Sequence, residues 1–292
     1  MANIPKILTA LGFSCPVKDI TQFQAEEDNN PYQVWKIDTG DRSVVLKKTT
    51  PEEREVYETF FPGGGGPVPK IYGFGEYEKE LYMLMEYVPG ATMSRCTRQK
   101  LTLALDALIA MQEQYWNDTA HAAAGYGFDS SWPNRQKRLP YMADLTDAYQ
   151  AYLDAFRSVP RTLCNDDMLP INVLVDADRA VIIDWEFAGI LPYPCALTRL
   201  IAFGEEGSEE LFQMTGEDKK FALDYYYENL VRSKGISRAE YDRTMQLFFL
   251  KEYSEWVYCA GLSGDYEMDH YKKYYKKARE LADKLGFTEK SS

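Results

Sequence analysis

The spacing of apolar residues changes near residue 97, and this change constrains the fold of the chain more than any other feature. Before it, short runs rich in β-branched and aromatic residues alternate with turn residues. After it, apolar residues recur every three or four positions over long segments, which is the period of helices that bury one face. The pattern predicts an α+β chain with a small β-rich N-terminal lobe, residues 1–90, and a larger helical C-terminal lobe, residues 91–292.

The first lobe contains strand patterns around a single helix. The stretch 51–61 begins with proline, has acidic residues in its first turn and carries apolar residues at helical spacing, so it predicts a helix. Four consecutive glycines at 63–66 must end this helix. The predicted strands are 32–38 and 43–48, joined as a hairpin by a short turn, then 70–77 and 81–87.

Helical periodicity dominates the second lobe. The predicted helices are 101–116, 140–157, 219–234, 238–260 and 266–285. One β-like segment, 171–186, interrupts them and predicts two short strands around the turn Asp176-Ala177-Asp178.

Composition excludes several classes of protein. The formal net charge of −12 disfavours nucleic acid as a partner, because phosphates require a basic surface. No apolar run reaches the roughly 18 residues that a spanning helix needs, and the N-terminus does not resemble a signal sequence, so we expect a cytoplasmic protein without a membrane partner. The five cysteines are scattered without a C-x-x-C pair, which predicts reduced thiols rather than disulfides or a zinc site.

The segment 163–186 (LCNDDMLPINVLVDADRAVIIDWE) carries the strongest chemical signal. It places Asp167, Asn172 and Asp184 at strand edges and in the loop between strands. Phosphoryl transfer to an alcohol needs a carboxylate that accepts the hydroxyl proton, and oxygen ligands that hold Mg²⁺ against the phosphates. An aspartate, an asparagine five residues later and a further aspartate after a hairpin supply this set. Each residue taken alone is equally compatible with an Asx turn or a strand-end cap.

The pattern D-x-x-x-x-N followed by I-D-W-E resembles the aminoglycoside phosphotransferase and choline kinase family, a branch of the protein-kinase-like fold. The resemblance spans roughly residues 20–205. It implies a bilobal protein-kinase-like fold and an ATP-dependent (or GTP-dependent) kinase that uses Mg²⁺ to phosphorylate a hydroxyl of a small molecule. It also implies that Asp167 is the catalytic base and that Asn172 and Asp184 bind magnesium, while Glu186 matches the second acid of the motif.

One position departs from the family pattern. The histidine expected two residues before the base is Asn165, and the residue between them, Asp166, is the alternative base. The departure supports a second hypothesis, a nucleotide-binding pseudokinase with a regulatory or scaffold role. Nucleotide hydrolysis measured with and without Mg²⁺ discriminates between the two.

The resemblance also assigns residues in the first lobe. Lys47 would contact the nucleotide phosphates and pair with a carboxylate of the following helix, for which Glu53 is favoured over Glu55. The loop 26–31 occupies the place of the phosphate-covering turn, although it has no glycine. The residues expected to contact adenine are Met85, Glu86 and Val88.

The sequence leaves the identity of the acceptor open. The resemblance favours a cationic acceptor, aminoglycoside-like or choline-like, held by carboxylates and aromatic faces through Coulomb and cation–π attraction. Tyr and Trp at helical spacing are more often part of a core, however, and glutamates are more often part of a solvated face. The candidates are Trp185, Glu205, Glu206, Glu209, Glu210, Asp224, residues 225–227, Glu252, Glu255, Trp256 and Tyr258.

Overall fold

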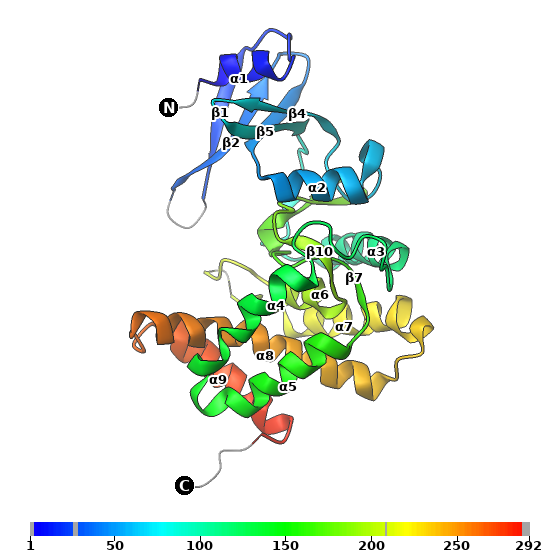
Figure 1. Ribbon diagram of the computed structural model, residues 1–292, viewed down its shortest axis with the longest axis vertical. Coiled ribbons are helices and arrows are strands. Elements are labelled where there is room, and N and C mark those ends of the chain that lie inside the picture. Colours follow the sequence, from blue (N-terminus) through cyan, green and yellow to red (C-terminus); the bar gives the residue numbers. More distant parts are fainter. Residues whose placement is uncertain (1–2, 26–28, 208, 288–292) are drawn as a thin grey trace.

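The computed structural model describes residues 3–25, 29–207 and 209–287 and has the expected α+β architecture, with a sheet in the N-terminal part and helices in the C-terminal part (Figure 1). Within these residues, the N-terminal sheet has five antiparallel strands in the order β1-β2-β3-β5-β4. The strands are β1 (Asp19–Gln24), β2 (Pro31–Asp38), β3 (Ser43–Lys48), β4 (Ile71–Tyr77) and β5 (Glu80–Glu86). In the predicted phosphate-covering loop, residues 26–28 lie outside the described residues.

The alternation of side chains along β3 decides where Lys47 points. Val44 packs in the small core formed with helix α1 (Ile4–Ala10), whereas Val45 belongs to the main core that includes helix α2 (Pro51–Phe60). Successive side chains of a strand point to opposite faces, so Lys47 shares the face of Val45 and is directed toward α2.

The C-terminal part packs helices around α8. The helices are α3 (Arg98–Gln114), α4 (Phe128–Gln136), α5 (Thr146–Ser158), α6 (Pro194–Ile201), α7 (Gly216–Asn229), α8 (Arg238–Ser263) and α9 (Asp269–Lys284). Helices α5, α6 and α9 all contact α8.

Two small sheets in this part frame the segment 163–186. Strand β7 (Arg161–Asn165) pairs with β10 (Ala188–Pro192). Strand β8 (Val173–Asp176) pairs with β9 (Arg179–Ile182) and with β6 (Ala91–Thr92). The chain leaves β7 into the loop that carries Asp167, and it leaves β9 into the turn that carries Asp184. The division of the chain after residue 90 stays a prediction.

Several predicted elements differ from those observed. The predicted helix 140–157 is wrong in its first turns, because α5 begins at Thr146 after two short 3₁₀ turns. The predicted helix 219–234 is wrong at its end, because α7 stops at Asn229 and a 3₁₀ turn follows. Strands β7 and β10 were not predicted, since nearly all their residues are buried and such strands show no alternation of polar and apolar side chains. None of the described helices is long and apolar enough to cross a membrane.

Candidate active site

Lys47 lies in an ion cluster between β3, α2 and the turn after β9. Its Nζ is 2.7 Å from Glu53 Oε1 and 2.8 Å from Asp184 Oδ1. Burial alone would lower the pKa of Lys47, but the charges of the two carboxylates and their hydrogen bonds outweigh burial and raise it above 10.5. Lys47 is therefore protonated at neutral pH and holds together two residues that belong to distant parts of the sequence.

The Glu53 carboxylate is almost fully buried and has a partner at each oxygen. Its Oε2 accepts a hydrogen bond from Thr49 Oγ1 at 2.6 Å, and its Oε1 accepts one from the backbone N–H of Trp185 at 3.1 Å in addition to the lysine. The alternative partner, Glu55, accepts a hydrogen bond from the backbone N–H of Gly125 at 3.1 Å instead. Of the two acids, Glu53 is thus the one that pairs with the lysine.

Asp184 has a backbone conformation that is unusual for aspartate. Its φ is 62°, in the left-handed region, and such strained residues persist where the surroundings hold them. Here the support is Asn165, whose Nδ2 donates to the Asp184 carbonyl at 2.8 Å. The Asp184 side chain is 43% exposed, so part of its carboxylate remains accessible beside the lysine.

Asn165 also fixes the loop that carries Asp167. Its Oδ1 accepts a hydrogen bond from the backbone N–H of Asp167 at 2.9 Å. One fully buried amide therefore links the Asp167 loop to the Asp184 turn. The residue that departs from the family pattern occupies a position where a side chain must both accept and donate a hydrogen bond, and asparagine does both.

Arg199 of α6 contacts Asp167, and the sequence analysis missed it. Its Nη2 lies 2.8 Å and its Nε 3.2 Å from Asp167 Oδ1. Burial raises the pKa of Asp167, Arg199 lowers it, and the nearby Asp184 and Asp166 raise it, with a net upward shift. Nothing in the sequence around Arg199 marks it, because it belongs to an apolar helix and meets the loop only in the folded chain.

Asp166, the alternative base, is committed to a different contact. Both of its carboxylate oxygens lie 2.7 Å from Nη2 of Arg135, which is itself buried. Burial alone would raise the pKa of Asp166, but the charges of Arg135, Lys251 and Arg199 and the hydrogen bond from Arg135 together outweigh burial and hold it below its usual value. A carboxylate held in this way is a weaker proton acceptor than Asp167.

Asn172 and Asp184 offer oxygen ligands of the kind that Mg²⁺ prefers. Asn172 Nδ2 donates to the Asp167 carbonyl at 2.9 Å, which leaves its Oδ1 for a cation. Burial and the charge of Asp184 raise the pKa of Glu186. Among residues 3–25, 29–207 and 209–287, no group of three or more His, Cys, Asp or Glu side chains could hold a metal ion.

The predicted adenine-contacting residues lie at the end of β5 and just after it. Met85 and Val88 are buried, with Met85 in the main core. The Glu86 side chain lies 2.6 Å from Arg179 of β9 and accepts a hydrogen bond from the backbone N–H of Lys70 at 3.1 Å. These contacts fix the segment that leads from the sheet into the helical part.

Comparison with known families classifies the chain. Residues 19–228, more than half of the chain, match the model of the phosphotransferase enzyme family. The chain belongs to this family. No curated protein matches the sequence of this phosphotransferase-family chain.

Several solved structures are similar in fold to this protein. The amicoumacin kinase hAmiN, in complex with AMP-PNP, Ca²⁺ and Ami, has a TM-score of 0.65 at 13% identity over 98% of this chain and 94% of that one. A choline/ethanolamine kinase family protein from Mesorhizobium loti has a TM-score of 0.61 at 13% identity over 97% and 95%. A thermostable mutant of the aminoglycoside phosphotransferase APH(4)-Ia, with AMP-PNP and hygromycin B, has a TM-score of 0.59 at 16% identity over 98% of both chains. At these identities the likeness shows a shared kinase-like fold.

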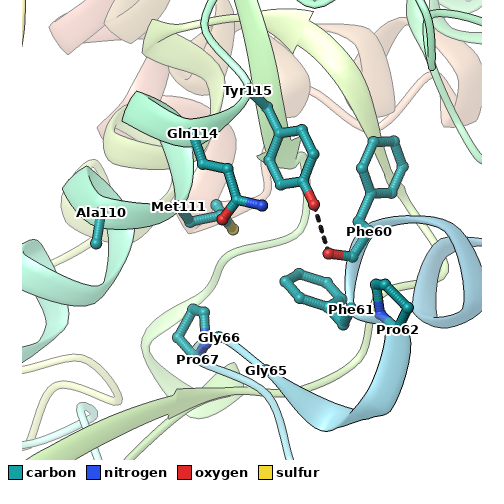
Figure 2. Close-up of a pocket in the computed structure, with 10 residues that line it drawn as sticks. All are labelled: Phe60, Phe61, Pro62, Gly65, Gly66, Pro67, Ala110, Met111, Gln114 and Tyr115. Atoms are coloured by element: carbon teal, nitrogen blue, oxygen red, sulfur yellow. Dashed lines mark hydrogen bonds between the residues drawn. The ribbon is translucent and has the colours of Figure 1, made fainter.

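A cavity of about 290 Å³ lies between the end of α2, the glycine-rich turn and α3 (Figure 2). None of the residues that line it belongs to the predicted site. The Tyr115 hydroxyl donates to the Phe60 carbonyl at 2.6 Å at its edge. Phe61 lines the cavity, and its ring centroid is 4.7 Å from that of Trp185. Trp185, one of the candidates for contacting an acceptor, is fully buried and belongs to the main core.

Most of the predicted acceptor-binding carboxylates have internal cationic partners. Glu252 and Glu255 contact Lys251 and Arg199. The other contacts are Glu205 with Lys277 and Lys273, Glu210 with Lys273, and Asp224 with Lys220 and Arg238. These ion pairs reduce the negative charge that the acids present to a cationic ligand.

Proposed function

We propose that this phosphotransferase-family protein is an ATP-dependent small-molecule kinase that transfers the γ-phosphate to a hydroxyl group of its acceptor. The observation that carries the proposal is the position of Lys47 between Glu53 and Asp184, at 2.7 and 2.8 Å. This cluster joins the N-terminal sheet to the turn that the Asn165 amide links to the Asp167 loop. The arrangement gives a cation for the phosphates, oxygen ligands for a metal ion and a carboxylate for the acceptor, which are the parts that phosphoryl transfer requires.

In the proposed reaction, the acceptor oxygen forms a bond to the γ-phosphorus. The bond between that phosphorus and the β–γ bridging oxygen breaks, the nucleoside diphosphate leaves, and the hydroxyl proton passes to Asp167 Oδ2. Lys47 neutralises phosphate charge, and Met85, Glu86 and Val88 form the adenine-binding segment. Asn172 and Asp184 would hold Mg²⁺, which neutralises developing charge on the phosphates when it is bound.

The enzyme hypothesis is favoured over the pseudokinase hypothesis. The pseudokinase hypothesis depended on Asn165 in place of histidine. Because Asn165 makes the hydrogen bonds that connect the Asp167 loop to the Asp184 turn, the substitution gives little reason to expect an inactive site. A cationic acceptor remains part of the proposal, and both ATP and GTP remain candidate phosphate donors.

The proposal is tested by incubating the protein with Mg²⁺ and ATP or GTP in the presence of aminoglycosides, amino alcohols and neutral polyols. We expect one acceptor class to gain the mass of one phosphate. Asp167→Asn should lower turnover by about 10³-fold, the scale of a lost general base, and leave ATP affinity unchanged. Asp154→Asn, an exposed change on α5, is the matched control.

Two results would contradict the proposal. If the parent protein phosphorylates no acceptor and shows no Mg²⁺-dependent nucleotide hydrolysis, it is not a kinase. If Asp167→Asn keeps full turnover on an identified acceptor, the base is a different residue.

A further inference from the structure

Asp167 belongs to a group of six charged side chains connected by ion pairs. We name it the α8 charge cluster, and it consists of Asp167, Arg138, Arg199, Lys251, Glu252 and Glu255. Three of its members are cations and three are carboxylates, so the cluster is electrically balanced. Its residues come from the Asp167 loop, the segment after α4, helix α6 and helix α8.

Arg199 contacts Asp167 in a way that distinguishes its two carboxylate oxygens. Both Nη2 and Nε donate to Oδ1, at 2.8 and 3.2 Å. Oδ2 lies 3.5 Å from Asn172 Nδ2, which is at the upper limit of hydrogen-bonding distance. A guanidinium presents its donors in a rigid plane, so this contact restrains rotation of the carboxylate and leaves Oδ2 to accept a proton.

The opposite edge of Arg199 contacts two acids of α8, of which Glu252 is buried and Glu255 is partly exposed. Its Nη1 lies 3.1 Å from Glu252 Oε2 and 3.5 Å from Glu255 Oε2. Glu252 is 1% exposed, and Lys251 lies 2.9 Å from its other oxygen. Buried charges persist only where they are paired, so removing one member leaves its partners uncompensated.

We propose that Arg199 is a positioning residue for Asp167 and that Glu252 and Glu255 hold Arg199 in place instead of binding the acceptor. The inference rests on the proposed function, in which Asp167 is the base. It removes two residues from the set of carboxylates available to a cationic acceptor. A positively charged part of the acceptor is then bound by other groups.

The two roles of Glu252 predict different kinetics. A ligand of the acceptor contributes to binding, so its loss raises the KM for the acceptor. A support of Arg199 contributes to the orientation of the base, so its loss lowers kcat and leaves KM unchanged.

The experiment measures kcat, the KM for ATP and the KM for the acceptor that the screen identifies. It compares Arg199→Lys and Glu252→Gln with the parent protein. Lysine keeps the charge but loses the planar pair of donors, and glutamine keeps the shape but loses the charge. We expect Arg199→Lys to lower kcat by about 10-fold or more with both KM values within about twofold, on the scale of a misplaced catalytic group. Glu252→Gln should lower kcat less, again without raising the KM for the acceptor. Glu228→Gln, an exposed change on α7 that removes a contact to Arg232, is the control for loss of charge.

A double-mutant cycle distinguishes the proposed positioning role of Arg199 from a merely structural role. In the Asp167→Asn background, Arg199→Lys should cause little further loss of kcat, because its effect acts through the carboxylate. An equal loss in both backgrounds would overturn the positioning role, and so would an unchanged kcat in Arg199→Lys. A raised KM for the acceptor in Glu252→Gln with unchanged kcat would assign Glu252 to the acceptor. Absence of Mg²⁺-dependent turnover in the parent protein would overturn the proposed function itself.

Discussion

Two regions of the molecule repeat one arrangement with different cations. On the nucleotide side, which we define as Glu53, Lys47 and Asp184, a buried glutamate holds a lysine that contacts a half-exposed aspartate. On the base side, which we define as Glu252, Arg199 and Asp167, an equally buried glutamate holds an arginine that contacts an aspartate whose side chain is 28% exposed. In both, the buried acid contacts the cation, and the cation contacts a partly exposed aspartate of the proposed site.

The difference between the cations matches the difference in their proposed tasks. Lysine carries a compact charge on a flexible stem, so it can contact a carboxylate and also neutralise a phosphate. Arginine presents a rigid plane of donors, so it fixes the rotation of a carboxylate. The comparison teaches that the nucleotide side is suited to neutralising charge and the base side to fixing an orientation.

The largest effect should come from removing the aspartate of the nucleotide side. We expect Asp184→Ala to lower turnover by about 10³-fold or more and to abolish most of the gain in ATP affinity that Mg²⁺ provides, because the ion loses a ligand. Calorimetry of ATP binding with and without Mg²⁺ measures this gain. An equal Mg²⁺ effect in the variant and the parent would show that Asp184 is not a ligand.

A large loss of stability should follow from removing the lysine. Lys47→Met leaves the buried Glu53 without its cation, which should cost about 3 kcal/mol in the free energy of unfolding. Lys48→Met is the matched control, because the adjacent side chain forms an exposed pair with Glu80 at 2.8 Å, and exposed pairs contribute little, so its loss should destabilise the protein far less. Urea unfolding measures both values. Equal losses would show that the Lys47 cluster adds no more stability than a surface pair.

Separating the two sides from each other should have an intermediate effect. Asn165→Ala removes the amide that joins the Asp184 turn to the Asp167 loop, and we expect a loss of about 2 kcal/mol in stability because buried backbone groups lose their partners. Turnover should fall as well, since both aspartates lose support. Asn165→His tests whether the family residue restores the link, with turnover and unfolding as readouts. Full activity in Asn165→Ala would contradict this role.

The smallest effect should appear in the pH dependence. Asp167 must be ionised to accept a proton, and its pKa is raised, mainly by burial, above the 3.8 of a free side chain. Turnover should therefore fall as the pH drops through this raised value. Because Arg199 lowers the pKa of Asp167, Arg199→Gln should move the acidic limb of the kcat profile to higher pH. An acidic limb that stays in place or moves to lower pH in Arg199→Gln would show that Arg199 does not lower the pKa of Asp167.

Short-range patterns predicted the strand and the helix of the nucleotide side, and the resemblance to the family selected Lys47 and Glu53 within them. The hairpin that carries Lys47 and the helix that carries Glu53 follow from residue periodicity and from a proline and acids at the helix start. The lysine and the glutamate are only six residues apart, so one strand and one helix suffice to bring them together. Their roles in catalysis stay predictions.

The base side could not be predicted to the same extent. The motif marked Asp167, but Arg199 and Glu252 lie 32 and 85 residues beyond it in ordinary helices. The acids of α8 were interpreted as acceptor candidates, because the sequence alone does not tell whether a glutamate faces a ligand or a buried cation. In the structure, Glu252 and Glu255 contact Arg199 and Lys251.

The sequence by itself determined the α+β architecture, the strands and helix around Lys47, and the spacing of Asp167, Asn172 and Asp184. These features depend on local periodicity, turn residues and short motifs, which act over a few residues. Only the tertiary structure decided which cation holds each aspartate, that Asn165 links them, and that Trp185 is buried. These contacts join residues far apart in the sequence, and burial is what makes each charge require a partner.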